Sequence, residues 1–445
     1  MKPKNICILG GGLSGLTQAW KQEQLGHRVT ILESSTKIGG VLQTEEREGY
    51  LLDYGANSLS LRYQDTADKL DQMGVLPNSI DANSIANKRF IVRRGKLVAL
   101  PLSFPSFFTS SFLSPMGKIR LLFEPFIPRG KEDANETVSS FIKRRLGQEA
   151  LDYAANPFIS GVYASKPETL HLGSAFPFLE ELEKKYRSIF LGMFRKKNTR
   201  KRLPKTRLIS FTRGMHQLTE LISNKLTNTT IMTNKSVLSV DRGESDWKLT
   251  IQSKEKVLKY IHCDELISTL PIQEVKRVQW RNLNASDKLS ELYQLTIFPL
   301  TLVYFGVDRS KIHHPLDGFG FLVPEKEKLS ILGTLFSSTI FPSRAPDGKV
   351  LLTTFIGGER NPDLSLKDDN YLKEMVRNEL AKLIGLQGNP EFFHVKRWPY
   401  SIPLPDYKMN IRKRAAEALS FANEGLTFSG SAFTGVSLPN CIDLN

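Results

Sequence analysis

Residues 4–15 read KNICILGGGLSG, and this stretch decides the fold of the 445-residue chain. The apolar run up to Leu9 predicts a buried strand, and the pattern after the glycines predicts a helix that ends near Leu25. Residues 28–33 (RVTILE) then predict a second strand. A strand, a G-x-G-x-x-G turn, a helix and a second strand form the βαβ unit that binds dinucleotides, because the glycines let a pyrophosphate approach the helix N-terminus.

Glu33 ends the second predicted strand, 21 residues after Gly12, where a carboxylate binds the hydroxyl pair of a ribose. With this acid in place, the unit predicts a bound dinucleotide; a glycine-rich turn without a ligand is the alternative. The residues predicted to hold the cofactor at this end are Gly10, Gly11, Gly12, Leu13, Ser14, Gly15, Glu33 and Ser34.

Further segments indicate which dinucleotide is bound. Residues 37–44 (KIGGVLQT) place a second glycine pair after the acid, and residues 53–58 read DYGANS. Residues 426–430 (LTFSG) predict a strand, followed by a turn that enters a helix. These segments resemble the flavin amine oxidase superfamily, which includes amine oxidases, phytoene desaturases and protoporphyrinogen oxidases. The resemblance implies FAD bound non-covalently, since Cys441 does not sit in the setting of a covalent flavin attachment.

The resemblance also implies which further residues contact FAD. Position 41 is often basic in these families, and Val41 departs from that pattern, so its backbone amide is expected to serve instead. The implied contacts are Gly40, Val41, Gly55, Ala56, Asn57, Ser58, Val237, Gly430, Ser431, Val436, Ser437 and Leu438. Because they come from both ends of the chain, a discontinuous FAD-binding domain is expected.

The middle of the chain narrows the resemblance to the protoporphyrinogen oxidase family. The matching strings are residues 87–90 (NKRF), 157–164 (PFISGVYA), 267–271 (ISTLP), 318–324 (GFGFLVP), 332–338 (LGTLFSS), 341–346 (FPSRAP) and 351–358 (LLTTFIGG). The resemblance runs from Lys4 to Ile442. It implies a porphyrinogen substrate, a reduced tetrapyrrole with propionate groups. It also implies hydride transfer to flavin N5 in three two-electron steps, with oxygen or another electron acceptor.

The resemblance assigns roles to several residues. Arg89 is expected to bind a propionate, because a guanidinium pairs bidentately with a carboxylate; an ordinary surface cation is the alternative. Asn57 is expected beside the flavin, where its amide could polarise or orient the substrate. Asn57 and Arg89 are therefore the candidate catalytic residues. The residues expected to line the macrocycle site are Gly161, Leu322, Leu335 and Phe355. From the residues alone, the last three are core residues of strands and the glycine belongs to a turn.

Apart from the resemblance, the middle region predicts a sheet. Its apolar, β-branched runs are residues 296–306, 318–324, 330–336 and 350–356. Together with the resemblance, this implies fold class α/β (α+β), with a discontinuous Rossmann-like FAD-binding domain, an inserted mixed-sheet substrate domain and a helical, membrane-docking domain. The expected bounds are 1–85, 205–270 and 395–445 for the FAD-binding domain, 86–100 and 271–394 for the substrate domain, and 101–204 for the helical domain.

Other classes of site are not expected. The sequence shows no Ser-His-Asp set, no metal-ligand cluster and no pair of catalytic carboxylates. His313-His314 falls at a predicted strand boundary and reads as a solvated turn. The three cysteines are too scattered for a disulfide framework or a zinc site, and the N-terminus does not read as a signal peptide. A cytoplasmic protein with reduced thiols is therefore expected.

The positive charge is concentrated in one segment. Lys and Arg total 61 against 46 Asp and Glu, which gives a net charge of +15. Residues 184–207 (KKYRSIFLGMFRKKNTRKRLPKTR) contain 11 Lys or Arg and no acid. Family members carry a membrane-docking domain in this region, so a peripheral contact with the cytoplasmic face of the inner membrane is expected. A solvated loop and steering of propionates are alternatives; nucleic acid is not an expected partner, because no recognised module accompanies the charge.

The leading functional prediction is oxidation of protoporphyrinogen IX in heme biosynthesis. The nearest alternative is a coproporphyrinogen III oxidase of the same fold, acting one decarboxylation earlier, which extra cations in the pocket would favour. More distant alternatives are an amine or carotenoid oxidoreductase, and a membrane-associated flavin-binding protein without turnover. A homodimer is compatible with the sequence.

Overall fold

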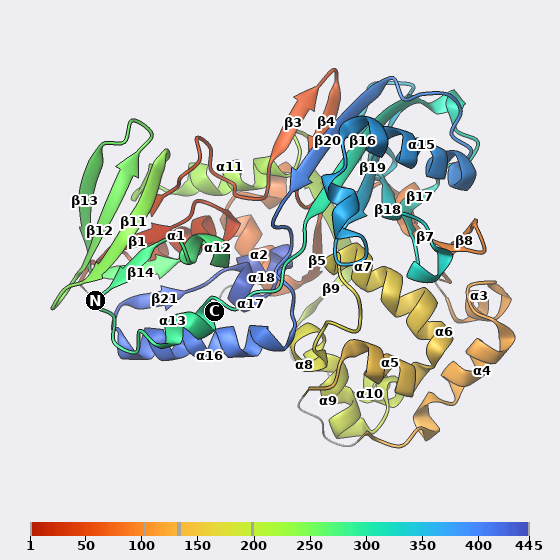
Figure 1. Cartoon of the computed structure of the whole chain (residues 1–445), viewed down its shortest axis with the longest axis horizontal. Coiled ribbons are helices and arrows are strands. Elements are labelled where there is room, and N and C mark those ends of the chain that lie inside the picture. The colour runs from red at the N-terminus through yellow and green to blue at the C-terminus, as the bar shows by residue number, and fades with distance from the viewer. Residues whose placement is uncertain (1, 102, 131–134, 197–199, 444–445) are drawn as a thin grey trace.

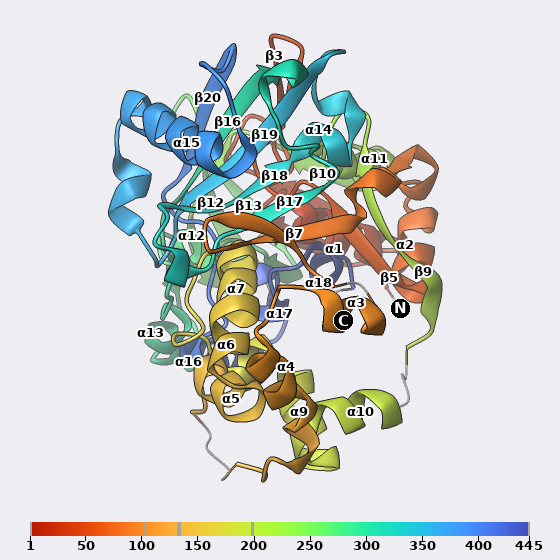
Figure 2. The ribbon, with the colours of Figure 1, turned by 90° about the vertical axis from the view of Figure 1, so that its right-hand side faces the viewer.

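The computed structural model describes residues 2–101, 103–130, 135–196 and 200–443. A nucleotide lobe, which contains β1 and α1, lies beside a sheet lobe, which contains β16–β19 (Figure 1). A group of short helices, α3 to α10, lies below the sheet lobe. Turned by 90°, the molecule shows α7 directly beneath β7 and β17 (Figure 2).

The nucleotide lobe is built on a five-stranded parallel sheet. Its strands, in order across the sheet, are β10 (Thr229–Met232), β2 (Arg28–Leu32), β1 (Asn5–Leu9), β14 (Glu265–Ser268) and β21 (Leu426–Phe428). Ile6 and Ile8 pack on the side of α1 (Leu13–Gln24), and Cys7 and Leu9 pack on the other side, as alternation along a strand requires. The strands come from three separate stretches of chain, so the predicted discontinuous α/β fold is confirmed.

A four-stranded sheet closes the second side of this lobe, where its Trp247 shares a buried cluster with Cys7 and Leu9. Its strands are β13 (Leu258–Cys263), β12 (Trp247–Ser253), β11 (Lys235–Arg242) and β15 (Gln279–Arg281). The helices of the lobe are α2 (Gln64–Gln72), α11 (His216–Lys225), α12 (Ile272–Val275), α13 (Lys288–Leu292), α16 (Tyr407–Ala422), α17 (Ser431–Thr434) and α18 (Leu438–Ile442).

The sheet lobe contains a mixed seven-stranded sheet. Its strands, in order, are β20 (Phe392–Trp398), β16 (Leu300–Asp308), β19 (Lys349–Gly357), β18 (Ile331–Phe336), β17 (Gly318–Leu322), β7 (Lys88–Arg93) and β8 (Lys96–Ala99). The four predicted runs are therefore strands of one sheet, as expected. The first begins later than predicted, at Leu300, since the preceding Pro299 has no N–H for the ladder.

The two faces of this sheet have different neighbours. Val303 and Leu352 pack on the face covered by α15 (Asp369–Ile384). Leu302 and Leu351 pack on the opposite face, against residues of β4. That second face therefore looks toward the nucleotide lobe. The smaller sheets are β3 (Thr44–Arg47) with β4 (Tyr50–Asp53), and β5 (Leu59–Tyr63) with β9 (Arg202–Phe211) and β6 (Ser79–Asp81).

The helical region packs around its own buried cluster, which includes Phe141, Leu170 and Leu182. Its helices are α3 (Phe104–Thr109), α4 (Pro115–Leu122), α5 (Val138–Leu146), α6 (Gln148–Ala150), α7 (Asn156–Tyr163), α8 (Leu172–Ala175), α9 (Pro177–Tyr186) and α10 (Ile189–Arg195). The basic segment 184–207 spans the end of α9, α10 and the start of β9; residues 197–199 lie outside the described part. None of the described helices is both long and apolar enough to cross a bilayer.

Candidate active site

The first glycine turn requires glycine at two of its positions. Gly10 has a φ of +99°, a conformation that side chains disfavour. A Cβ added to Gly15 would lie 1.9 Å from the carbonyl oxygen of Gly10, which is far inside contact distance. The turn and α1 can therefore meet this closely only because Gly15 has no side chain.

Gly12 has a different role, because the protein itself leaves room beside it. A Cβ added to Gly12 would meet only the Cα of Gly40, at 3.8 Å, which is ordinary contact. Gly12 is the N-cap of α1, and no described side chain caps that helix. The first-turn amides and the gap between Gly12 and Gly40 thus form a cradle that a Cβ would fill, which fits a pyrophosphate.

Glu33 lies at the end of β2, beside this turn, as predicted from its spacing. Its Oε2 accepts a hydrogen bond from the amide of Gly11 at 2.8 Å, and its Oε1 accepts one from Ser35 at 2.8 Å. The carboxylate is thus held in one orientation at the sheet edge. The amide of Lys235 donates to the Glu33 carbonyl oxygen at 2.9 Å, so β11, which carries Val237, begins beside the predicted ribose and Ser34 positions.

The other predicted cofactor segments converge on the same turn. A Cβ added to Gly55 would lie 2.1 Å from the carbonyl oxygen of Val41, so these two backbones are in contact. Gly430, with a φ of +97°, lies against Ser14. Val41 itself points outward and is 57% exposed, which leaves its backbone as its part of the site. The remaining predicted contacts lie in the β4–β5 loop (Ala56, Asn57, Ser58) and around α17 and α18 (Ser431, Val436, Ser437, Leu438).

The predicted macrocycle residues share one face of the seven-stranded sheet. Leu322 of β17 lies opposite Gly333 of β18, which lies opposite Phe355 of β19. Leu335, two residues beyond Gly333, projects from the same face. Because Gly333 has no side chain, Leu322 can lie close against it: a Cβ added to Gly333 would lie 2.5 Å from the carbonyl oxygen of Phe321 and 3.1 Å from Leu322 Cδ2. A Cβ added to Gly161 of α7 would lie 2.5 Å from Leu322 Cδ2, so α7 forms one wall of this face.

Arg89 lies at the edge of the same face, on β7. Its guanidinium stacks 4.1 Å from the ring centroid of Phe319, and its Nη1 donates to the carbonyl oxygen of Ala86 at 2.7 Å. Among the described residues, no carboxylate pairs with it. Burial lowers the pKa of Arg89, since desolvation disfavours its charge. An anionic ligand group would relieve that cost, which fits the predicted propionate contact.

A family model described as flavin containing amine oxidoreductase matches residues 13–443. The chain belongs to this family. Mitochondrial protoporphyrinogen oxidase from Nicotiana tabacum is 32% identical over 463 residues, covering 98% of this chain and 92% of that protein. Coproporphyrinogen III oxidase from Bacillus subtilis (strain 168) is 26% identical over 464 residues, covering 99% and 96%. A solved putative protoporphyrinogen oxidase from Exiguobacterium sp. 255-15 shares the fold, with a TM-score of 0.79, 23% identity and 99% and 97% coverage.

Membership of the flavin containing amine oxidoreductase family confirms the predicted flavoprotein oxidoreductase. The similarity to the Nicotiana tabacum enzyme confirms the resemblance to protoporphyrinogen oxidases. Membership of the family also explains why glycines from three separate segments meet at α1. The contacts assigned to individual residues stay predictions. The segment 50–55 connects the two groups of predicted residues, since Tyr50, Leu52 and Tyr54 pack against the apolar face of the sheet and Gly55 contacts Val41.

Two features of this flavoprotein are not predictable from the sequence. Arg344 forms a buried ion pair with Asp53, although the strings that contain these residues indicate only the family resemblance. Trp398 of β20 donates its indole N–H to the carbonyl oxygen of Tyr54 at 2.8 Å and so anchors the loop that carries Asn57. The sequence around a buried acid or a tryptophan does not indicate which residue it will pair with or hydrogen-bond to.

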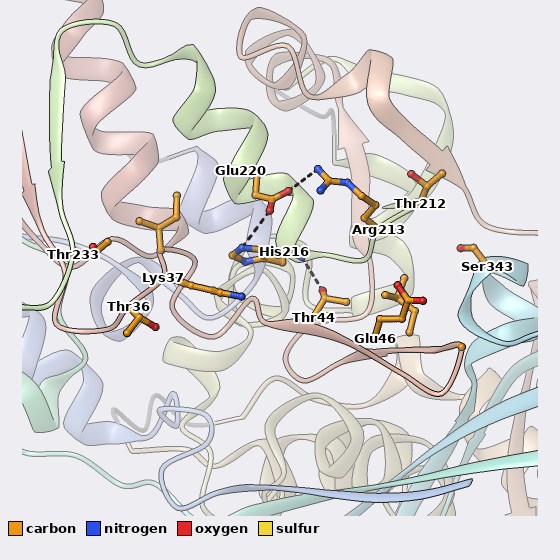
Figure 3. A pocket seen from close by; sticks show the side chains of 13 residues that line it. Thr36, Lys37, Thr44, Glu46, Thr212, Arg213, His216, Glu220, Thr233 and Ser343 are labelled. Carbon is orange, nitrogen blue, oxygen red and sulfur yellow. Dashed lines mark hydrogen bonds and ion pairs between the residues drawn. The ribbon is translucent and has the colours of Figure 1, made fainter. Parts of the chain in front are cut away.

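A cavity of about 750 Å³ lies behind the second glycine pair (Figure 3). Lys37, Thr44 and His216 line it, and Glu220 of the same cavity pairs with Arg213 at 2.7 Å. None of the predicted cofactor or substrate residues lines this cavity. It is therefore distinct from the site formed by the predicted cofactor and substrate residues.

Proposed function

We propose that this flavoprotein binds FAD non-covalently and oxidises protoporphyrinogen IX to protoporphyrin IX in heme biosynthesis, with oxygen as electron acceptor. One observation carries the proposal. Arg89, a partly buried cation without a carboxylate partner among the described residues, borders an apolar face formed by Leu322 and Phe355 that looks toward the nucleotide lobe. A flat, apolar macrocycle with carboxylate substituents fits such a face.

The cradle would hold the FAD. The amides of α1 and the gap between Gly12 and Gly40 suit its pyrophosphate, and Glu33 suits a ribose. The described cysteines, Cys7, Cys263 and Cys441, are all buried, and Cys441 packs in the core beside α1, which supports non-covalent attachment.

When bound, the flavin supplies the acceptor for hydride from a ring carbon. The residues of this chain bind and orient the substrate. Leu322, Leu335 and Phe355 present apolar surface to the macrocycle and exclude water, while Arg89 holds a propionate at the edge. Asn57, in the loop beside the cradle, orients the reacting ring. Conversion to the porphyrin removes six electrons and six protons in three steps, so three oxygen molecules leave as three hydrogen peroxide molecules.

The coproporphyrinogen reaction is the second candidate, since coproporphyrinogen III oxidases also match this chain over 99% of its length. The two substrates differ in their number of propionates. Steady-state turnover of both porphyrinogens, followed by porphyrin fluorescence, separates the candidates. The proposal requires the higher kcat/KM for protoporphyrinogen; a higher value for coproporphyrinogen would replace it with the second candidate.

We also propose that the helical region attaches the enzyme peripherally to the cytoplasmic face of an anionic membrane. Phe126 is 79% exposed and Phe194 of α10 is 89% exposed, and the segments that carry them pack together. Arg195 and Lys196 follow Phe194 in the chain, and exposed apolar side chains next to cations suit an interfacial attachment.

Flotation with anionic vesicles tests the attachment. Phe126→Asp with Phe194→Asp should remain in the soluble fraction while the unaltered protein floats. Phe421→Asp is the matched control, because Phe421 is equally exposed but lies on α16 of the nucleotide lobe. Equal flotation of all three proteins would remove the membrane proposal.

A further inference from the structure

Arg360 connects the two walls of the predicted macrocycle site. It follows the end of β19, and its guanidinium reaches between α7 and β17. Nη1 donates to the carbonyl oxygen of Val323 at 2.8 Å, and Nη2 donates to Ser160 Oγ at 2.8 Å and to Asn156 Oδ1 at 3.1 Å. The planar guanidinium thus hydrogen-bonds to α7 and to the end of β17 at the same time.

Two of the three residues that Arg360 bonds to are chain neighbours of Leu322 and Gly161, which approach each other across the gap. Val323 follows Leu322, and Ser160 precedes Gly161. The approach there is close, because a Cβ on Gly161 would lie 2.5 Å from Leu322 Cδ2. A small movement of α7 would therefore change how Leu322 is presented on this face of the sheet.

Burying the Arg360 guanidinium in this way is unfavourable if its only role is to stabilise the fold. Arg360 hydrogen-bonds only to neutral acceptors, and no described carboxylate bonds to it. Its Nε is buried and has no hydrogen-bond partner. Burial lowers its pKa to about 10, which reflects the cost of holding a charge there. A cost of this kind is typical of groups that fix a geometry.

The helix that Arg360 holds is also irregular. A π-helical turn, Leu151–Ala155, joins α6 to α7 directly before Asn156. Such turns widen a helix locally and occur often at functional sites. Contacts with the segment after β17 therefore help to position α7. Arg360 supplies three of them, and the amide of Glu325 donates to Asn156 Oδ1 at 3.0 Å.

We propose that Arg360 is a positioning residue that sets the spacing between Gly161 and Leu322 and thereby the fit of the macrocycle. The inference rests on the proposed function, because it concerns the same substrate site. Arg360 acts through α7 and β17 and does not itself touch the porphyrinogen.

Arg360→Met and Arg360→Lys test the inference with protoporphyrinogen. We expect the KM of Arg360→Met to rise about tenfold or more, with kcat and FAD content nearly unchanged, since a misplaced wall weakens substrate fit. The KM of Arg360→Lys should lie between those of the unaltered protein and Arg360→Met, because one ammonium group cannot hydrogen-bond to both elements as the planar guanidinium does. Lys326→Met is the control: its exposed ion pair with Asp152 joins the same two segments at the surface.

A double-mutant cycle separates positioning from general destabilisation. Gly161→Ala should raise KM strongly in the unaltered protein and little further in Arg360→Met, where α7 is already free to shift. If Arg360→Met does not fold, the cycle uses Arg360→Lys. An unchanged KM in the Arg360 variants, or additive effects of the two substitutions, would overturn the inference while leaving the proposed function intact. Absence of porphyrinogen turnover by the unaltered protein would overturn both.

Discussion

Asp53 and Arg344 form an ion pair in which Oδ2 lies 3.0 Å from Nη2, and both side chains are almost completely buried. Arg344 also donates to the carbonyl oxygen of Phe211 at 3.0 Å and to Ser210 Oγ at 2.6 Å. The pair therefore joins β4, the end of β9 and a turn of the sheet lobe. Burial raises the pKa of Asp53, and the Arg344 guanidinium opposes that shift.

Arg344→Met should destabilise the protein by about 3–5 kcal/mol, because it leaves a buried carboxylate without its partner. Urea unfolding followed by tryptophan fluorescence measures the change. The double variant Asp53→Asn with Arg344→Met should lose less unfolding free energy than Arg344→Met alone, since no unpaired charge remains. A loss below about 1 kcal/mol for Arg344→Met would show that the pair does not hold the two lobes together.

Gly12→Ala should weaken FAD binding without unfolding the protein. The added methyl meets only Gly40 Cα at 3.8 Å, so the fold tolerates it, but it occupies the space of the pyrophosphate. We expect FAD affinity to fall about 100-fold, or about 2.7 kcal/mol. Fluorescence titration of the apoprotein measures the affinity, and circular dichroism checks the fold. Unchanged affinity would place the pyrophosphate elsewhere.

Arg89→Gln should raise the KM for protoporphyrinogen about 30-fold, equivalent to about 2 kcal/mol, since a charge-assisted hydrogen bond to a propionate is lost. FAD content should not change. Arg94→Gln is the control, because Arg94 is an exposed cation on the same hairpin. An equal, small effect of both substitutions would make Arg89 an ordinary surface cation.

Acid should loosen the contact between the helical region and the sheet. Burial opposes ionisation of Glu149, but hydrogen bonds from Ser114 and Arg93 outweigh it and hold the pKa below its usual range. A carboxylate with a depressed pKa stabilises the fold above its unfolded pKa and loses that effect as pH falls through the folded value. Glu149→Gln should therefore lose less stability than the unaltered protein between about pH 5 and pH 3. Equal pH slopes for Glu149→Gln, the unaltered protein and the exposed-site control Glu424→Gln would contradict this assignment.

The sequence carried enough information for the nucleotide lobe and for the strands of the large sheet. Glycines at Gly10 and Gly15 are required by local backbone geometry, so their spacing is readable from the chain alone. The β-branched runs of β16 to β19 are likewise local signals. The sequence predicted that Leu322 and Phe355 take part in one site, but only through resemblance to a family.

The long-range polar contacts were not readable. Asp53 and Arg344 are 291 residues apart, and nothing near either residue points to the other. The same holds for Arg360 and Ser160. Such pairs depend on how two lobes dock, which neither hydrophobic periodicity nor turn chemistry encodes. The composition of residues 184–207 indicates only a basic, partly apolar segment. Its division into helix and strand depends on packing against the rest of the chain.

Anaerobic mixing of the FAD-loaded protein with protoporphyrinogen tests whether this protein oxidises porphyrinogens. The long-wavelength absorption band of the flavin should bleach as the porphyrinogen is oxidised, and bleaching should be slower with coproporphyrinogen. Admission of oxygen should then restore the band. A flavin that stays oxidised with both porphyrinogens would contradict the assignment of this protein as a porphyrinogen oxidase.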